Sequence, residues 1–331
     1  MENASNITNS SKRHVSKYFE DYRMVVTWTL AIETVFMVVG TGLNLWFLLS
    51  ILTSKDLRVR MRNQLIVNLN AVHLLQTTVK CPVLILKNAA VLHRVLLTRE
   101  FFCHTYSIIT SADQTQSFIA DWLMVFIVGI FIANIMDVDV ASKWTPQVSR
   151  FSKAAMHLLP WVVAIVVTPI GISQATRWYP CLVIPWRKLY IFETVYTIIP
   201  TAITLLLMVI AIVLRYRRFS HGSRTGGANM GVQLIGKGAE IDNTFAYVFA
   251  AFLCVACEVC HLIFSFEIIE WKYRGLKYHM ASYLVSDSRV ILMLLPWLLL
   301  PDIRQRLRSW RPWQREAAGI DLTIAYGKES S

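Results

Sequence analysis

The sequence predicts an all-α membrane protein: a bundle of seven transmembrane helices with an extracellular N-terminus and a short amphipathic helix after the seventh span. The 331-residue chain is 55% hydrophobic and only 16% charged, whereas soluble domains average about 25% charged residues. Its mean hydropathy is +0.46. Apolar runs recur along the chain, each long enough to cross about 30 Å of hydrocarbon, which takes roughly 20 helical residues.

The apolar runs divide the chain into an N-terminal tail (1–23), a membrane domain (24–300) and a C-terminal segment (301–331). Their spacing leaves no room for a separate soluble domain. The tail is polar, so the first span is expected to act as the insertion signal. The seven expected spans are 24–52, 63–86, 108–138, 153–175, 189–214, 244–268 and 280–300.

The N-terminal tail indicates the orientation of the bundle. Asn3, Asn6 and Asn9 each begin an Asn-x-Ser/Thr acceptor pattern for glycosylation, which is used on the luminal or extracellular side. With this end outside, the cytoplasmic segments hold 18 of the 33 Lys and Arg residues, against 13 outside, a modest positive-inside bias. The alternative is that the tail is merely polar and disordered.

The basic residues predict contact with lipid rather than with nucleic acid. The net charge is +12, but the positive side chains form short clusters between apolar runs. Beside a bilayer, such clusters anchor the cytoplasmic ends or bind anionic lipid. Arg215 and Arg218 form one cluster at the end of the fifth expected span.

A second basic cluster follows Pro301. Ile303, Leu307 and Trp310 recur there at the i, i+4, i+7 spacing of one helix face, and arginines are interleaved between them. This pattern is typical of an amphipathic helix that lies on the inner leaflet. The alternative is a solvated charged tail.

The six cysteines do not indicate an enzyme or a metal protein. Cys103 and Cys181 lie near expected loops, which allows one extracellular disulfide. Cys254, Cys257 and Cys260 share one apolar run, where small soft side chains pack well between helices. The sequence has no recognisable catalytic motif or phosphate loop, so we expect no enzymatic activity, no cofactor and no metal.

Short motifs in several spans resemble the rhodopsin-like class of G-protein-coupled receptors. The similarity extends over about 24–311. The motifs that carry it are Gly42-Leu43-Asn44, the run Asn63–Ala71, Trp161 with Pro169, Tyr196–Pro200, Trp178–Cys181 and Leu295–Leu299.

The resemblance implies a plasma-membrane receptor that passes a signal from an extracellular ligand to a heterotrimeric G protein. It implies a disulfide between Cys103 and Cys181, with unpaired cysteines as the alternative. It also places four residues at positions of the family's conformational switch; at one of these, His73 stands where the family has a sodium-binding Asp. The four positions are Asn44, His73, Pro200 and Pro296.

The chain departs from the family pattern at its activation motifs. Counting back from Pro146, Asp139 and Val140 stand where the family has the Arg and Tyr of Asp-Arg-Tyr. The Trp-x-Pro of the sixth span is absent, and Leu295 replaces the Asn of Asn-Pro-x-x-Tyr. Coupling through Asp139, Val140, Arg215 and Arg218 would therefore use unusual contacts. Cys103 lies 36 residues before Asp139, an excess of about three turns that an elongated helix or a loop insertion would explain.

Ionisable residues inside the spans are costly in hydrocarbon and indicate function. The resemblance places Asp121 and Arg289 on opposite sides of its ligand pocket, as an ion pair or as ligand contacts. Glu193 and Glu258 add acidic groups on neighbouring spans. Because Arg289 would neutralise Asp121, we expect a peptide or other polar ligand rather than a monoamine. The ionisable candidates are Glu33, His73, Lys80, Asp121, Glu193, Glu258, Asp287 and Arg289.

Two other functions remain open. A non-signalling decoy or scaffold would explain the Asp at position 139. A transporter or channel would explain the intramembrane charges, but the sequence shows neither repeats nor interrupted helices, which are typical of transporters.

Overall fold

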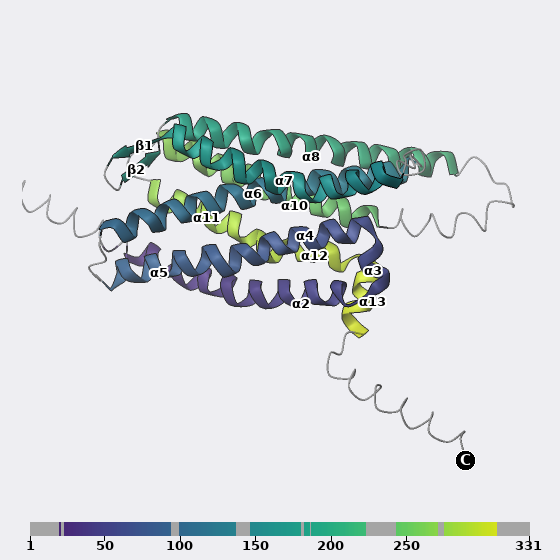
Figure 1. The fold of residues 1–331 in the computed structure, drawn as a ribbon, viewed down its shortest axis with the longest axis horizontal. Helices are drawn as coiled ribbons and strands as arrows, with labels where there is room; N and C mark the ends of the chain where they lie inside the picture. The colour runs from purple at the N-terminus through teal and green to yellow at the C-terminus, as the bar shows by residue number, and fades with distance from the viewer. Residues whose placement is uncertain are drawn as a thin grey trace, which may run out of the picture.

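A computed structural model describes most of the chain. The residues it describes are 20, 23–93, 99–136, 146–179, 182–185, 187–222, 243–270 and 275–309. Their helices lie side by side in one elongated bundle (Figure 1). A two-stranded antiparallel hairpin, formed by β1 (Thr176–Tyr179) and β2 (Leu182–Pro185), lies at one end of it.

The helical segments follow the predicted order. The first runs from Arg23 to Leu52 and includes a π-helical turn. The second has a similar turn in its middle. The elements are η1 (Phe36–Gly40), α2 (Thr41–Leu52), α3 (Lys55–Val59), α4 (Met61–Leu75), η2 (Gln76–Lys80), α5 (Cys81–Leu92), α6 (Arg99–Ile135), α7 (Pro146–Ala175), α8 (Arg187–Gly222), α10 (Thr244–Glu270), α11 (Gly275–Leu292), α12 (Leu294–Leu298) and α13 (Pro301–Ser309).

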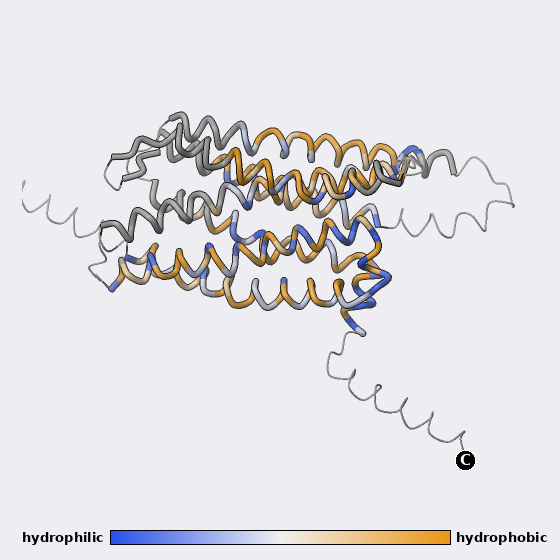
Figure 2. The backbone as a smooth tube through the Cα atoms, viewed as in Figure 1, coloured by the Kyte–Doolittle hydropathy of each residue, from blue (hydrophilic) through white to orange (hydrophobic). Residues whose placement is uncertain are grey.

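Five helices in the described part of the chain are long and apolar enough to cross a membrane, and six if the bent pair that ends in α13 is one span. The described apolar part of α7, Phe151–Val167, is shorter. In the coloured parts of the helices apolar residues predominate, and polar residues gather at the end that holds α3 and α13 (Figure 2). These features support a multi-pass helical membrane protein. The count of seven spans and the extracellular position of the N-terminus remain predictions.

The distribution of side chains suits a lipid solvent. Large apolar groups cover the outside of the helices; Leu206 on α8 is 59% exposed and Val162 on α7 is 57% exposed. Several charged groups are buried instead. In hydrocarbon, apolar surface can face outward without cost, and charges must lie between helices where they find partners.

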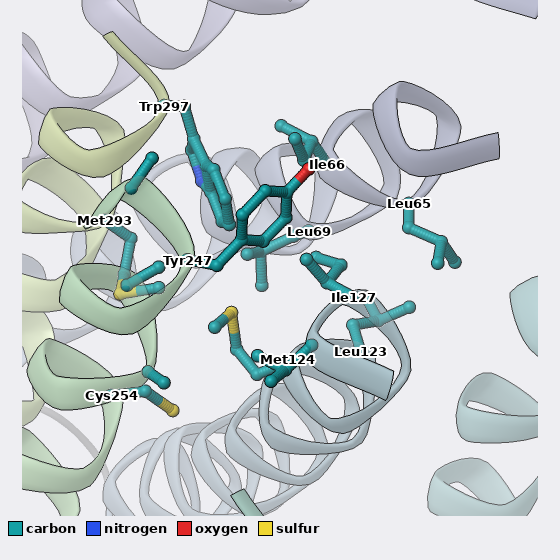
Figure 3. Packing of buried hydrophobic residues seen from close by; sticks show 14 of the residues in the cluster. Leu65, Ile66, Leu69, Leu123, Met124, Ile127, Tyr247, Cys254, Met293 and Trp297 are labelled. Carbon is teal, nitrogen blue, oxygen red and sulfur yellow. The ribbon is translucent and has the colours of Figure 1, made fainter. Parts of the chain in front are cut away.

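The apolar core joins α4, α6, α10 and α12. The ring of Tyr247 stacks on Phe131 at 4.1 Å between centroids and meets Trp297 edge-on at 6.2 Å. Met124 and Leu69 pack in the same cluster (Figure 3). Offset and edge-on aromatic pairs stabilise a core beyond the area that they bury.

Three features of the fold differ from the sequence-based expectations. The hairpin at 176–185 was not predicted, because its eight strand residues lie in a short loop without clear alternation. The π-helical turns η1 and η2 and the break at Met293 interrupt helices that were expected to be regular. Finally, α6 is 37 residues long and contains Cys103, so the excess spacing is an elongated helix and not a loop insertion.

Helix α13 confirms the amphipathic helix expected after the last span. Its axis is bent by 101° from the preceding helix. Ile303 and Leu307 are buried against the bundle. Asp302 accepts hydrogen bonds from Arg60, at 2.8 Å, and from Arg62, and these contacts fix α13 to the turn between the first two helical segments.

Candidate functional site

Helix α11 brings two charged residues of opposite sign into the middle of the bundle. Asp287 and Arg289 are two positions apart, so their side chains leave the helix about 200° apart. They therefore reach different neighbouring helices, and two separate buried clusters form around them.

The Arg289 cluster consists of Arg289, Asp121, Glu258 and Cys254. Arg289 Nη2 lies 2.6 Å from Asp121 Oδ1 on α6, and Nη1 donates to Glu258 Oε1 on α10. The Cys254 thiol lies 3.5 Å from Asp121 Oδ1. All four side chains are buried. One guanidinium thus connects three helices through charge-assisted hydrogen bonds, which are about twice as strong as neutral ones.

The Asp287 cluster consists of Asp287, Lys80, Gln76 and Glu33. Asp287 Oδ1 accepts hydrogen bonds from Lys80 Nζ and from Gln76 Nε2, both at 2.6 Å. Gln76 and Lys80 are four residues apart on η2, so they share one helix face. Glu33, on the first helical segment, lies beside Asp287 and Lys80. This cluster joins the first and second helical segments to α11.

A small cavity lies between the two clusters. Its volume is about 10 Å³, close to what one water molecule needs. His73, Gln116 and Arg289 line it. Both ring nitrogens of His73, Gln116 Oε1 and Arg289 Nε have no hydrogen-bond partner among the described residues. Together they offer donors and acceptors, which suits a water molecule better than a bare ion.

Close packing supports both clusters. A Cβ atom at Gly40 would lie 2.9 Å from Thr77 Cγ2 and 3.1 Å from Val290 Cγ2, so a glycine is required where the first helical segment meets η2 and α11. One turn further along, Asn44 Nδ2 donates to the backbone oxygen of Val290 at 2.8 Å.

The structure brings together three of the predicted ligand-binding residues, Asp121, Glu258 and Arg289. The ion pair between Asp121 and Arg289 is confirmed. The predicted switch residues do not form one cluster. Asn44 donates a hydrogen bond to the backbone of α11, and His73 lines the cavity. Pro200 lies within α8 and Pro296 within α12. Arg215 lies near the end of α8, apart from these groups.

Other predicted site residues lie outside the part that the structure describes. They are the glycosylation positions Asn3, Asn6 and Asn9, the side chains of Cys103, Glu193 and Arg218, and the residues Asp139, Val140 and Cys181.

The sequence did not predict the roles of Cys254, Gln76 and Gln116. Cys254 was assigned to helix packing, but it contacts Asp121 and Arg289. Gln76 and Gln116 are neutral, so a search for intramembrane charges does not find them. The available signal was their position: Gln76 precedes Lys80 by one helical turn, and Gln116 lies five residues before Asp121.

Comparison with known proteins does not place the chain in a family: no family model matches it, and no curated protein sequence matches it.

Proposed function

We propose that this protein is a receptor of the rhodopsin-like class that passes an extracellular signal to heterotrimeric G proteins at the plasma membrane. The observation that carries the proposal is the Arg289 cluster. It connects α6, α10 and α11 through one guanidinium, so separating these helices requires breaking buried ionic hydrogen bonds. A bundle with such a connection has a defined resting state that a ligand can shift.

Motif contacts give further support. Two residues that carry the resemblance meet in the structure, because Trp161 Nε1 on α7 donates to Asn68 Oδ1 on α4 at 2.9 Å. Asn44, from a third motif, joins the first helical segment to α11. In lipid, polar contacts of this kind hold helices together where no hydrophobic effect does so.

The ligand that fits best is a peptide or other polar molecule. Asp121 and Glu258 are buried and already paired with Arg289, so neither offers a free carboxylate to a simple amine. A ligand would act by changing how α6, α10 and α11 pack, from contacts nearer the outer end of the bundle.

Coupling tests the proposal. We would express the full chain in cultured cells with energy-transfer sensors for each G-protein class and measure both basal activity and responses to peptide and amine panels. Glu258→Gln should raise basal coupling because it weakens one arm of the cluster; Glu20→Gln, the same change at an exposed position before the first helical segment, is the matched control. Silence of wild type and Glu258→Gln with every sensor and panel would reject coupling.

A substitution at position 139 distinguishes a non-signalling decoy from a receptor that couples to G proteins. In a decoy bundle, Asp139→Arg should create coupling that wild type lacks. A natively coupled receptor should change little or lose activity, since its own contacts are already in place.

One observation favours a transporter as the second candidate: charged groups are buried within helices that are long and apolar enough to cross a membrane. The cavity between them has a volume of about 10 Å³, room for about one water molecule, so it offers no route for a larger substrate. Uptake or ion current in proteoliposomes would support transport over signalling.

A further inference from the structure

The Asp287 cluster contains one carboxyl group too many for its cations. Glu33, Lys80 and Asp287 are each 0% exposed. If both acids were ionised, two negative charges would face one ammonium in the interior of a membrane protein. An uncompensated charge there is costly, and two neighbouring carboxyl groups avoid the cost when one of them keeps its proton.

The hydrogen bonds point to the same imbalance. Asp287 Oδ1 already accepts from Lys80 and Gln76. Asp287 Oδ2 and both oxygens of Glu33 have no donor among the described residues. Yet the Glu33 carboxyl lies beside Asp287. Two acceptors without a donor between them leave buried oxygens unsatisfied, which costs about 1–3 kcal/mol each.

We propose that Glu33 is a proton-binding site: in the resting bundle it is a neutral carboxylic acid whose O–H donates to Asp287 Oδ2. This single proton turns two opposed acceptors into a donor–acceptor pair. It also balances the cluster, because Lys80 then faces one carboxylate, Asp287. The proton comes from water when the bundle assembles and returns there when Glu33 ionises, and no other reactant is needed.

The other groups around Glu33 fit this assignment. Its neighbours are Asp287 on α11, Lys80 on η2 and the Cys81 thiol at the start of α5. Asp287 accepts hydrogen bonds from both Lys80 and Gln76, so it is the group of the two that is better stabilised as a carboxylate. The thiol adds a weak donor beside Glu33 and no second cation.

The site couples protons to helix packing. Glu33 lies about two turns before Gly40, where the first helical segment touches η2 and α11 most closely. Removing the proton places a second negative charge at this junction. The folded bundle binds this proton more strongly than the unfolded chain, so its stability must decrease as the pH rises through the ionisation of Glu33.

Infrared spectroscopy tests the proposal on the full chain in lipid nanodiscs, with no need for a signalling assay. Wild type should show a C=O stretching band of a buried protonated carboxyl group that shifts only slowly in D₂O. Glu33→Gln should remove one such band. Asp302→Asn, which alters a carboxylate paired with Arg60 and Arg62 at the edge of the bundle, should leave the band unchanged. An unchanged band in Glu33→Gln overturns the proposal.

Thermal unfolding provides the second measurement. The melting temperature of wild type should fall as the pH is raised to alkaline values, and that of Glu33→Gln should fall less, because an amide donates but cannot ionise. A Glu33→Gln chain that does not fold would contradict the proposal. So would a wild-type melting temperature that rises when sodium replaces choline at constant ionic strength, since a cation would then balance the cluster.

Discussion

At the scale of single residues, Arg289 has the most consequential position in the bundle. It is 3% exposed and binds two carboxylates on two other helices. A buried ion pair is weak evidence for stability by itself, because desolvation offsets its attraction. Removing one partner is different, since it leaves the other charges buried without compensation.

We therefore expect Arg289→Met to destabilise the bundle strongly. Asp121 and Glu258 would face each other as unpaired acids, and breaking a buried pair costs about 3–5 kcal/mol. The measurement is the melting temperature of the detergent-solubilised protein. The triple variant Asp121→Asn, Glu258→Gln, Arg289→Met removes every charge and should recover most of the loss. If Arg289→Met alone melts like wild type, the guanidinium does not hold the three helices together.

The sequence predicted the Arg289 cluster better than the Asp287 cluster. The pairing of Asp121 with Arg289 followed from their places in a familiar seven-helix pattern. Glu33, Lys80 and Asp287 were recognised as costly charges, but nothing in a linear sequence says which face of which helix meets which neighbour. Cys254 and Gln76 were missed because neither is charged, although each lies within hydrogen-bond distance of an acid, Asp121 and Asp287 respectively.

At the scale of the helices, one irregular turn carries two side chains of the Asp287 cluster. The π-helical turn η2 includes both Gln76 and Lys80, and η1 ends at Gly40. Such turns are rare and are often found at functional sites. Sequence periodicity predicts where a helix lies along the chain, but it does not resolve one extra residue in a turn, so these irregularities were not predicted.

The meeting of the first helical segment, η2 and α11 depends on Gly40. We expect Gly40→Ala to lower stability by about 1–3 kcal/mol, the usual cost of overpacking, because the added Cβ would lie 2.9 Å from Thr77 Cγ2. Its matched control is Gly42→Ala on the same helix, where nothing lies within 4 Å of the new Cβ. The measurement is the melting temperature of both variants. Equal melting temperatures would mean that the close contact at Gly40 does not require a glycine.

At the scale of the whole molecule, the fold class was predictable and the topology in detail was not. Apolar runs predicted helices because hydrocarbon leaves few other ways to satisfy backbone groups. Helix α13 was predicted because Ile303 and Leu307 share one face, and both are buried. The hairpin at 176–185 was not, since its strands are short and pair through backbone bonds that any sequence can form.

The orientation of the chain is a prediction for the intact molecule. If the N-terminus is extracellular, an epitope tag placed before Met1 should bind antibody on intact cells, whereas a tag after Ser331 should bind only after permeabilisation.

In that orientation Asn3, Asn6 and Asn9 should carry glycans, because only the luminal or extracellular side of the membrane has the transferase. Treatment with a glycosidase should then increase the mobility of the chain on a gel, and replacing all three Asn by Gln should abolish this shift. The charge distribution favours the same orientation. Arg60 and Arg62 bind Asp302 of α13, and basic clusters beside membrane spans are typical of the cytoplasmic side. An N-terminal tag that is reached only after permeabilisation would reverse the bundle and remove the basis for an extracellular ligand.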